Sequence, residues 1–520
     1  MNIIKGEKMN HIPEYTGDLE KLLYRRQFLI GPTTYQPNNY WRSFQLNHDL
    51  WLSIHEDLEF FSKTEGENSV ILIGISIDCT NPYKSQEQIL ETLFTSFSNI
   101  QSIIEASKPL SGRWVIICQD SKDTILFTDP GGLRPVYYYT EGTRIWCASQ
   151  PALIDQVKKL SVSTDESLQT FINNPEFHKK ESAWIGNKTI YENCFHLMPN
   201  HYLSCKQAKQ TRFFPTIQLS KINDPDQAAT EVSNYLKNII NGAFRKYDII
   251  ITLTAGFDSR LLLAASTEIA EKTTFYVEDM GYLKSYHNDI WVSKKLAKKF
   301  DLDFNIIGIE EPVPNWFTDI LAQNVMHART SPIPPKIISI YSKLVRNENR
   351  IVINGNVTEI VRINEGKKSY NQKVTDSMGN STIEAIVDFS GYTNPFVVDE
   401  IKEWSESIDI SYLEEANIFD MFHWEQKVGN WGALYPSEQD IAVDRISPFN
   451  CRLILETCLK APRDSRSAPD YPFFKLIIAK LWPELLTIPI NPGPRRLGLL
   501  KKRLRENLPQ PITDLIRKFI

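Results

Sequence analysis

The sequence predicts a chain of two domains that differ in fold class. Residues 1–215 are expected to form an antiparallel β-sheet domain, because they read as short apolar strands joined by polar turns. Residues 225–520 are expected to form a doubly wound parallel α/β domain with a helical C-terminal part, because strands and helices alternate there. The length of 520 residues supports this division, since a single hydrophobic core rarely grows beyond about 250–300 residues.

The N-terminal prediction rests on a series of short apolar runs that are rich in β-branched residues. Each run is bounded by polar or glycine-containing turns, of which the segment 129–134, DPGGLR, is the densest. Runs of this kind are typical of antiparallel sheets and of sandwiches of two sheets. The expected strands are residues 70–77, 113–118, 124–128, 135–139 and 144–149.

The pattern changes near residue 220, and we place the domain boundary at 212–225. Asp224 and Pro225 are a typical helix start, and apolar residues from 228 to 243 keep helical spacing on one face. Beyond them, buried-strand runs alternate with helical segments, which indicates a parallel sheet with helices on both faces. The expected strands are residues 247–253, 272–277, 304–309 and 350–354, with helices at 258–266 and 289–300 and mostly helix from about 385 onward.

The composition excludes several classes of protein. Apolar residues make up 42% of the chain, and the net charge is −5, from 58 Lys and Arg against 63 Asp and Glu. No overall basic field therefore points to nucleic acid or an anionic membrane as a partner. No run of about 20 apolar residues predicts an integral membrane span, and the N-terminus lacks the apolar centre of a signal peptide.

Cysteine usage predicts a reducing compartment. The seven cysteines are an odd number, and no two are spaced as Cys-x-x-Cys. This disfavours a disulfide framework and a zinc ribbon, so we expect a cytoplasmic protein. Cys451 and Cys458, seven residues apart, are expected to be buried thiols rather than a metal pair.

The strongest chemical signal is the segment 250–260, IITLTAGFDSR. A buried strand ends at Leu253, a loop of small residues follows, and a helix begins at Asp258 and Ser259. Small residues let backbone N–H groups approach a ligand, and the positive end of a helix favours an anion, so the segment suits a polyphosphate. Asp258 would then hold the Mg²⁺ that accompanies phosphates, or it would only cap the helix. The spacing matches neither GxxxxGK[ST] nor GxGxxG.

Residues 254–259, TAGFDS, resemble the S-G-G-x-D-S pyrophosphate loop of the asparagine synthetase family. Other segments between about residues 70 and 495 resemble motifs of that family in the same order along the chain. They are 112–117 and 129–138 (G-x-F-A and D-x-x-G-x-x-P-L-Y-Y), 197–203 (L-P-P-G-H), the helix from Asp289 (D-x-x-x-A), 355–360 (G-x-G-x-D-E), 444–450 (E-x-R-x-P-F-L-D) and the helix with Lys475 (K-x-x-L-R).

The resemblance implies a glutaminase-like, Ntn-hydrolase-like domain over 1–215 and a PP-loop (HUP-like) synthetase domain over 225–520. It also implies ATP bound beyond the strand ends, with the adenine near the backbone of Val277. Asp258, Glu359 and Lys475 would be the catalytic residues: Asp258 and Glu359 would hold Mg²⁺, and Lys475 would stabilise developing negative charge. The nucleotide-binding residues that it implies are Leu253, Thr254, Gly256, Asp258, Ser259, Val277 and Gly355.

The implied reaction is ATP-dependent amide-bond formation. A carboxylate of a small molecule, a carrier or a peptide would be adenylated with release of pyrophosphate, and ammonia or another amine acceptor would then displace AMP. A glutaminase of this type needs a cysteine at the processed N-terminus, whereas this chain has Asn2 and no cysteine before Cys79. We therefore expect a ligase without its own glutaminase activity, similar in this respect to β-lactam synthetases and lasso-peptide cyclases.

Two alternative functions stay open. Ala255, Val357 and Thr358 depart from the family motifs, which favours a catalytically degenerate protein that binds ATP or serves as a scaffold. The other alternative is glutamine-hydrolysing asparagine synthesis, which predicts release of glutamate from glutamine. The sequence also leaves a homodimer open.

Several residues have simpler structural interpretations. Glu359 also fits an acid in a first helical turn, and Lys475 also fits a lysine that extends from an apolar helix to solvent. His287 fits a surface residue better than a base. Residues 423–433 fit core packing as well as an acceptor-substrate pocket. The basic segment 495–518 fits a solvated helix face better than a contact with anionic lipid or a phosphorylated carrier.

Overall fold

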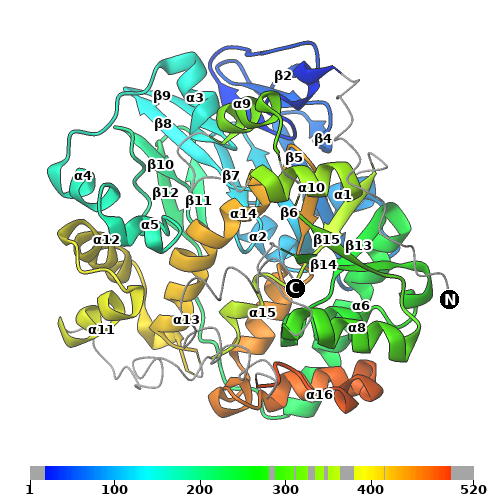
Figure 1. Cartoon of the computed structure of the whole chain (residues 1–520). Coiled ribbons are helices and arrows are strands. Elements are labelled where there is room, and N and C mark those ends of the chain that lie inside the picture. Colours follow the sequence, from blue (N-terminus) through cyan, green and yellow to red (C-terminus); the bar gives the residue numbers. More distant parts are fainter. Residues whose placement is uncertain are drawn as a thin grey trace, which may run out of the picture.

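The computed structural model describes residues 18–279, 287–309, 312–325, 334–344, 349–363, 380–414 and 416–493. Figure 1 shows strands of the N-terminal half in blue to cyan above the green strands β13, β14 and β15. Asn2 and the basic segment 495–518 lie outside the described residues. Within these ranges, no helix is long and apolar enough to cross a membrane.

The N-terminal half forms two six-stranded sheets, and every strand pair in them is antiparallel. The first sheet has the order β10-β8-β9-β1-β3-β2, with β1 (Phe28–Gly31), β2 (Trp41–Gln45), β3 (Trp51–His55), β8 (Tyr137–Glu141), β9 (Arg144–Ala148) and β10 (Cys194–His196). The second has the order β12-β11-β7-β6-β5-β4, with β4 (Phe60–Glu65), β5 (Asn68–Asp78), β6 (Leu110–Gln119), β7 (Thr124–Thr128), β11 (His201–Ser204) and β12 (Lys209–Arg212).

The two antiparallel sheets pack face to face, because alternate residues of their strands point into a shared apolar core. Ile30 of β1 and Ile54 of β3 meet Ile71 of β5 and Ile117 of β6 in this core. Helices cover both outer faces, which gives a four-layer, Ntn-like arrangement. They are α1 (Gln86–Ser96), α2 (Ile100–Ser107) and α6 (Pro225–Lys246) on the second sheet and α3 (Pro151–Lys158) on the first, with α4 (Glu166–Ile172) and α5 (Pro175–Lys179) further along the chain.

The five predicted N-terminal strands are confirmed as β5 to β9, and the remaining strands and all helices of this half were not predicted.

The C-terminal half contains a five-stranded parallel sheet with the order β15-β14-β13-β16-β17. Its first strand, β13, lies in the centre, so the chain builds outward first on one side and then on the other. The strands are β13 (Asp248–Thr252), β14 (Thr274–Asp279), β15 (Phe304–Gly308), β16 (Arg350–Ile353) and β17 (Asp444–Ile446), of which only β17 was not predicted.

Helices cover both faces of the parallel sheet, as the alternating pattern predicted. Ile249 and Ile251 of β13 face α6, α7 (Phe257–Ala265) and α8 (Asn288–Phe300), whereas Ile250 faces α9 (Asn315–Asn324) and α10 (Pro334–Leu344). Asp224 caps α6 through its side chain, as expected from the sequence. The helical C-terminal part comprises α11 (Asn380–Ser390), α12 (Pro395–Glu406), α13 (Ile418–Phe422), a π-helix (His423–Gly432), α14 (Ala433–Glu438), α15 (Arg452–Leu459) and α16 (Pro472–Leu481).

A buried ion network joins the antiparallel sheets to the parallel sheet. Arg113 of β6 donates two hydrogen bonds to Asp440, at 2.5 and 2.7 Å, and a third to Asp444 at 3.0 Å. Arg134 donates to the other oxygen of Asp444 at 2.7 Å. Despite burial, Arg134 and Arg113 lower the pKa of Asp444 to about 2. All four side chains are buried, so the charges are screened little by water.

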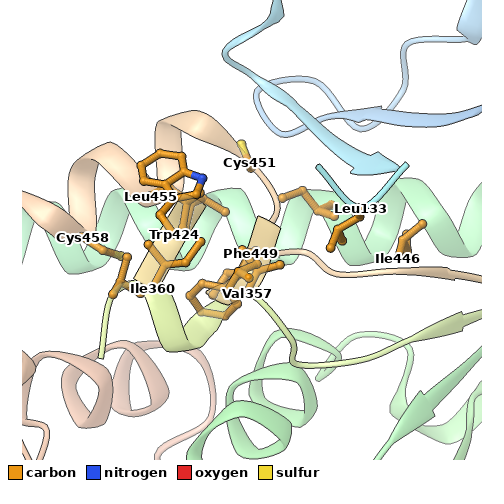
Figure 2. Close-up of a cluster of buried hydrophobic side chains, with 14 of the residues drawn as sticks. Leu133, Val357, Ile360, Trp424, Ile446, Phe449, Cys451, Leu455 and Cys458 are labelled. Carbon is orange, nitrogen blue, oxygen red and sulfur yellow. The ribbon is translucent and has the colours of Figure 1, made fainter. Parts of the chain in front are cut away.

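An apolar cluster lies beside this network and contains residues from both halves of the chain. Figure 2 shows Leu133 of the N-terminal half near Val357, Ile446 and Phe449 of the C-terminal half. The indole N–H of Trp424 also donates to the carbonyl oxygen of Pro130 at 2.6 Å. The two halves therefore share a core, and the domain limits 1–215 and 225–520 stay a prediction.

Replacing Arg113 with methionine should destabilise the protein strongly. The change leaves Asp440 and Asp444 buried with one compensating cation fewer, and breaking a buried ion pair from one side costs about 3–5 kcal/mol. Urea or thermal unfolding followed by circular dichroism measures the loss. The matched control is Lys179→Met, which removes an exposed ion pair with Glu176 and should change stability little. Equal effects of the two substitutions would contradict the structural role of the buried network.

Candidate functional site

Polar side chains line a cavity at the carboxyl ends of the parallel strands. A cavity of about 510 Å³ opens there beside β13, β14, β16 and β17. In open α/β sheets this edge, at the point where the strand order reverses, is where ligands bind. Of the residues predicted to bind nucleotide or metal, Thr254, Asp258, Ser259, Val277 and Gly355 line the cavity. Residues to which the sequence assigned no ligand also line it, among them Tyr276, Glu278, Asp289, Tyr435 and Arg445.

The predicted phosphate loop follows β13 and is held in place by its own side chains. The hydroxyl of Ser259 accepts a hydrogen bond from the backbone N–H of Thr254 at 3.0 Å and lies 3.0 Å from the Thr254 hydroxyl. Asp289, at the start of α8, accepts from the N–H of Ala255 at 2.9 Å. The loop is thus organised before any ligand arrives.

Helix α7 begins directly after the loop and points its N-terminus at the cavity. Gly256 occupies the N-cap position, and no side chain makes a capping hydrogen bond there. The interpretation of Asp258 as the helix cap is therefore wrong, because Asp258 lies in the first turn of the helix. The first N–H groups of a helix have no partner within the helix, so this end offers donors and partial positive charge to an anion.

Asp258 and Glu359 form a carboxylate pair that interacts electrostatically, and Arg362 lies near both acids. The Asp258 Oδ2 atom lies 2.8 Å from Nη2 of Arg362. Burial raises the pKa of Asp258, and Arg362 opposes this rise. Burial and the nearby charge of Asp258 raise the pKa of Glu359 to about 7. One oxygen of each acid, Asp258 Oδ1 and Glu359 Oε2, is buried without a hydrogen-bond partner.

This carboxylate pair fits a magnesium ion. The pair and Arg362 together carry a net charge of −1 when both acids are ionised, and the two unpartnered oxygens are the hard ligands that Mg²⁺ prefers. Among the residues described, no group of three or more His, Cys, Asp or Glu side chains is placed to hold a metal. That suits an ion held by one or two carboxylates together with substrate phosphates rather than by a complete protein cage.

Glycine is required at position 355 because the backbone there passes close to helix α7. A Cβ atom added to Gly355 would lie 2.5 Å from the Cβ of Asp258. Ala255, Val357 and Thr358, the three residues that differ from the resembled motifs, do not line the cavity. Ala255 and Val357 are buried in the apolar core, where Figure 2 shows Val357 among its neighbours. Thr358 is buried and donates its hydroxyl hydrogen to the carbonyl oxygen of Gly355 at 2.7 Å.

The opposite wall of the cavity contains a cation cluster that the sequence did not predict. Glu278, at the end of β14, accepts from Lys336 of α10 at 2.5 Å and from Arg445 of β17 at 2.9 Å. Although burial opposes it, Arg445 and Lys336 lower the pKa of Glu278. Lys336 also contacts the hydroxyl group of Tyr435. Two cations face one carboxylate, so the cluster carries one net positive charge.

Four of the predicted site residues are not among those that line the cavity: Leu253, Gly256, Glu359 and Lys475. The side chain of Leu253 is buried in the core, although its backbone N–H bonds to the carbonyl oxygen of Tyr276 at 2.7 Å. Lys475 lies on α16, where its side chain is 41% exposed and pairs with Asp470 at 2.7 Å. His287 lines the cavity and accepts from the N–H of Asp289, the second residue of α8.

The other candidate residues are structural in this arrangement. Trp424 and Glu425 of the π-helix are buried, and Glu425 pairs with Arg212 at 2.6 Å, so this segment belongs to the core between the halves. Cys79, buried after β5, lies 3.7 Å from the sulfur of Cys451. The hydrogen bond with Cys451 and burial raise the pKa of Cys79, which disfavours the thiolate that a nucleophile requires.

Comparisons with known proteins found distant structural likenesses alone. No protein-family model and no curated protein matches the chain. Glutamine phosphoribosylpyrophosphate amidotransferase from B. subtilis, complexed with ADP and GMP, is 11% identical over 66% of this chain and 73% of its own, with a TM-score of 0.23. NMN synthetase from Francisella tularensis is 12% identical over 39% of this chain and 93% of its own, with a TM-score of 0.20.

The NH3-dependent NAD synthetase from Campylobacter jejuni subsp. jejuni is 14% identical over 37% of this chain and 90% of its own, with a TM-score of 0.19. At these scores the likenesses are distant. The strand orders and helix layers of this chain therefore define its fold class: an Ntn-like pair of antiparallel sheets together with a doubly wound parallel sheet.

Replacing Glu359 with glutamine should stabilise the protein at pH 8 and leave its stability unchanged at pH 4.5. The folded-state pKa of about 7 lies above the ordinary value of 4.5, so the stability that protonation contributes is present below pH 4.5 and is lost as the pH rises through 7. At pH 8 glutamine removes a buried charge that costs on the order of 3 kcal/mol. Thermal unfolding at both pH values measures the effect, with exposed Glu192→Gln as control. A stabilisation independent of pH would contradict the raised pKa.

Proposed function

We propose that this protein is an ATP-dependent ligase that joins a carboxylate to ammonia or another amine without a glutaminase activity of its own. The observation that carries the proposal is the cavity at the strand ends, where an organised small-residue loop, a helix N-terminus and Asp258 of the carboxylate pair converge. Backbone donors and a helix dipole suit a triphosphate, and the carboxylates suit its metal ion.

The loop and the start of α7 would hold the pyrophosphate portion of ATP, with the adenine near the backbone of Val277. Asp258 and Glu359 would hold Mg²⁺, which neutralises phosphate charge when bound. Gly355 allows the chain after β16 to lie against Asp258, so both walls of the phosphate site come close together. Lys475 stays a candidate for charge stabilisation, although its present partner is Asp470.

The cation cluster on the opposite wall supports a carboxylate as the second substrate. Arg445 is buried beside the cavity, and its Nε atom lacks a hydrogen-bond partner. With Lys336, Glu278 and Arg445, the cluster has one positive charge in excess. A substrate carboxylate would balance that charge and would lie across the cavity from the phosphate loop.

The proposed reaction has two successive nucleophilic displacement steps. An oxygen of the substrate carboxylate attacks the α-phosphorus, and the bond from that phosphorus to the bridging oxygen breaks, so pyrophosphate leaves. The amine nitrogen then attacks the acyl carbon, AMP leaves with the carboxylate oxygen, and the nitrogen loses a proton. The residues at the site orient the reactants and exclude water, because both steps depend on position and on neutralised phosphate charge.

The second candidate function is nucleotide binding without turnover, for which the chain would be a scaffold. The departures from the resembled motifs at Ala255, Val357 and Thr358 favoured this function in the sequence. All three residues are buried and none lines the cavity, so these departures favour it less in the structure. Exchange of labelled pyrophosphate into ATP, screened over a panel of carboxylates with Mg²⁺, separates the two functions. Carboxylate-dependent exchange supports the ligase. ATP binding by calorimetry without any exchange supports the scaffold, and glutamate release from glutamine would favour the glutamine-hydrolysing alternative.

Asp258→Asn should reduce pyrophosphate exchange at least 100-fold. The substitution removes the negative charge that is needed to hold a divalent cation beside the phosphates, while it keeps the size of the side chain. Exchange assays at saturating ATP and Mg²⁺ measure the loss. The exposed Asp49→Asn variant is the matched control and should retain exchange. Activity of Asp258→Asn near the unsubstituted level would remove Asp258 from the metal site.

Lys336→Gln should raise the KM for the carboxylate about tenfold and leave the affinity for ATP within twofold. The substitution cancels the excess charge of the cluster and removes a charge-assisted hydrogen bond, which is worth about 1.5–3 kcal/mol. Exchange assays at varied carboxylate and calorimetry with ATP give the two values. Exposed Lys179→Gln serves as control. A loss of ATP affinity with an unchanged KM for the carboxylate would place the cluster at the nucleotide instead.

A further inference from the structure

Arg362 is a cation that the chain itself places on the predicted metal site. Its Nη2 atom lies 2.8 Å from Oδ2 of Asp258, and the two side chains are 13% and 27% exposed. The pair joins residues 104 positions apart in the sequence. No motif marked Arg362, so the contact arises from the fold alone.

Two backbone hydrogen bonds hold Ile363, the residue after Arg362. The N–H of Ile363 donates to the carbonyl oxygen of Arg466 at 3.0 Å, and Ile363 accepts from the N–H of Ala468 at 2.9 Å. The guanidinium also lies over the ring of Tyr471, 5.6 Å from its centroid. A side chain supported in this way loses little further entropy when it binds a carboxylate.

The ion pair opposes a divalent cation in two ways. The guanidinium covers Oδ2 of Asp258, which leaves Oδ1 and Glu359 Oε2 as the unpartnered oxygens of the acid pair. Its charge also repels a second cation a few ångströms away, and the low solvent access of the site strengthens that repulsion. A bound triphosphate would reverse the balance, because its oxygens supply both additional ligands and compensating negative charge.

We propose that Arg362 competes with the divalent cation for Asp258, so that the metal binds tightly only together with the nucleotide. This inference rests on the proposed function, since it presupposes that Asp258 and Glu359 hold the metal. Arg362 is then a positioning residue: it keeps the acid pair compensated in the nucleotide-free protein and makes metal and nucleotide binding mutually dependent.

Manganese serves as the probe, because free and bound Mn²⁺ are distinguished by electron paramagnetic resonance. Without nucleotide, Arg362→Gln should bind Mn²⁺ at least tenfold more tightly than the unsubstituted protein, and Arg362→Lys, which keeps the charge, should bind it weakly. Combining Asp258→Asn with Arg362→Gln should abolish the gain. Arg350→Gln, which breaks the Asp248–Arg350 pair at 2.6 Å, is the matched control and should leave Mn²⁺ affinity unchanged.

The outcomes separate this inference from the function on which it rests. With a non-hydrolysable ATP analogue present, the unsubstituted protein should bind Mn²⁺ tightly, and its failure to do so would overturn the metal site itself. Tight binding with the analogue, but equal nucleotide-free affinities for the unsubstituted protein and Arg362→Gln, would overturn the competition alone. Unfolding temperatures of all variants establish that they are folded. If Arg362→Gln does not fold, Arg362→Met replaces it: tighter nucleotide-free Mn²⁺ binding than in the unsubstituted protein supports competition, and equal binding overturns it.

Discussion

The buried ion network between Arg113, Arg134, Asp440 and Asp444 is the interaction on which the arrangement of this protein depends. Charges without access to water are costly unless they are paired, so the two halves of the chain are stable only in the register that pairs them. The network joins β6 of an antiparallel sheet to β17, the edge strand of the parallel sheet. It therefore fixes the position of one wall of the cavity, since β17 contributes Arg445 to that wall.

Adjacent residues of a strand point to opposite faces, so neighbouring side chains of β17 contact different parts of the molecule. Asp444 faces the N-terminal half and pairs with Arg134, whereas the next residue, Arg445, faces the cavity and pairs with Glu278. The N-terminal half has a physical role in this arrangement. It supplies the cations that hold Asp444, and through the strand it holds Arg445 beside the candidate substrate site.

Local secondary structure could be predicted from the sequence, whereas side-chain contacts between distant parts of the chain could not. The strand, small-residue loop and helix at 250–260 follow from propensity and periodicity, and the structure has them with the helix start shifted by one residue. Lys336, Glu278 and Arg362 could not be predicted, because each acquires its role from a partner more than 50 residues away. Strand β17 is only three residues long, too short for a period-two pattern to indicate it.

Three residues that differ from the motifs that the sequence resembles illustrate why a motif match alone is a poor measure of a site. A phosphate loop works through backbone N–H groups, so the side chain at 255 matters only if it enters the cavity, and Ala255 is buried in the core. Val357 keeps the positive φ of 76° that a glycine would adopt most easily, and burial of its side chain among apolar neighbours offsets the strain of that conformation. Gly355, in contrast, faces Asp258 at a distance that no side chain tolerates. The chain therefore keeps glycine where backbone meets the candidate metal site and replaces it where the side chain turns toward the core.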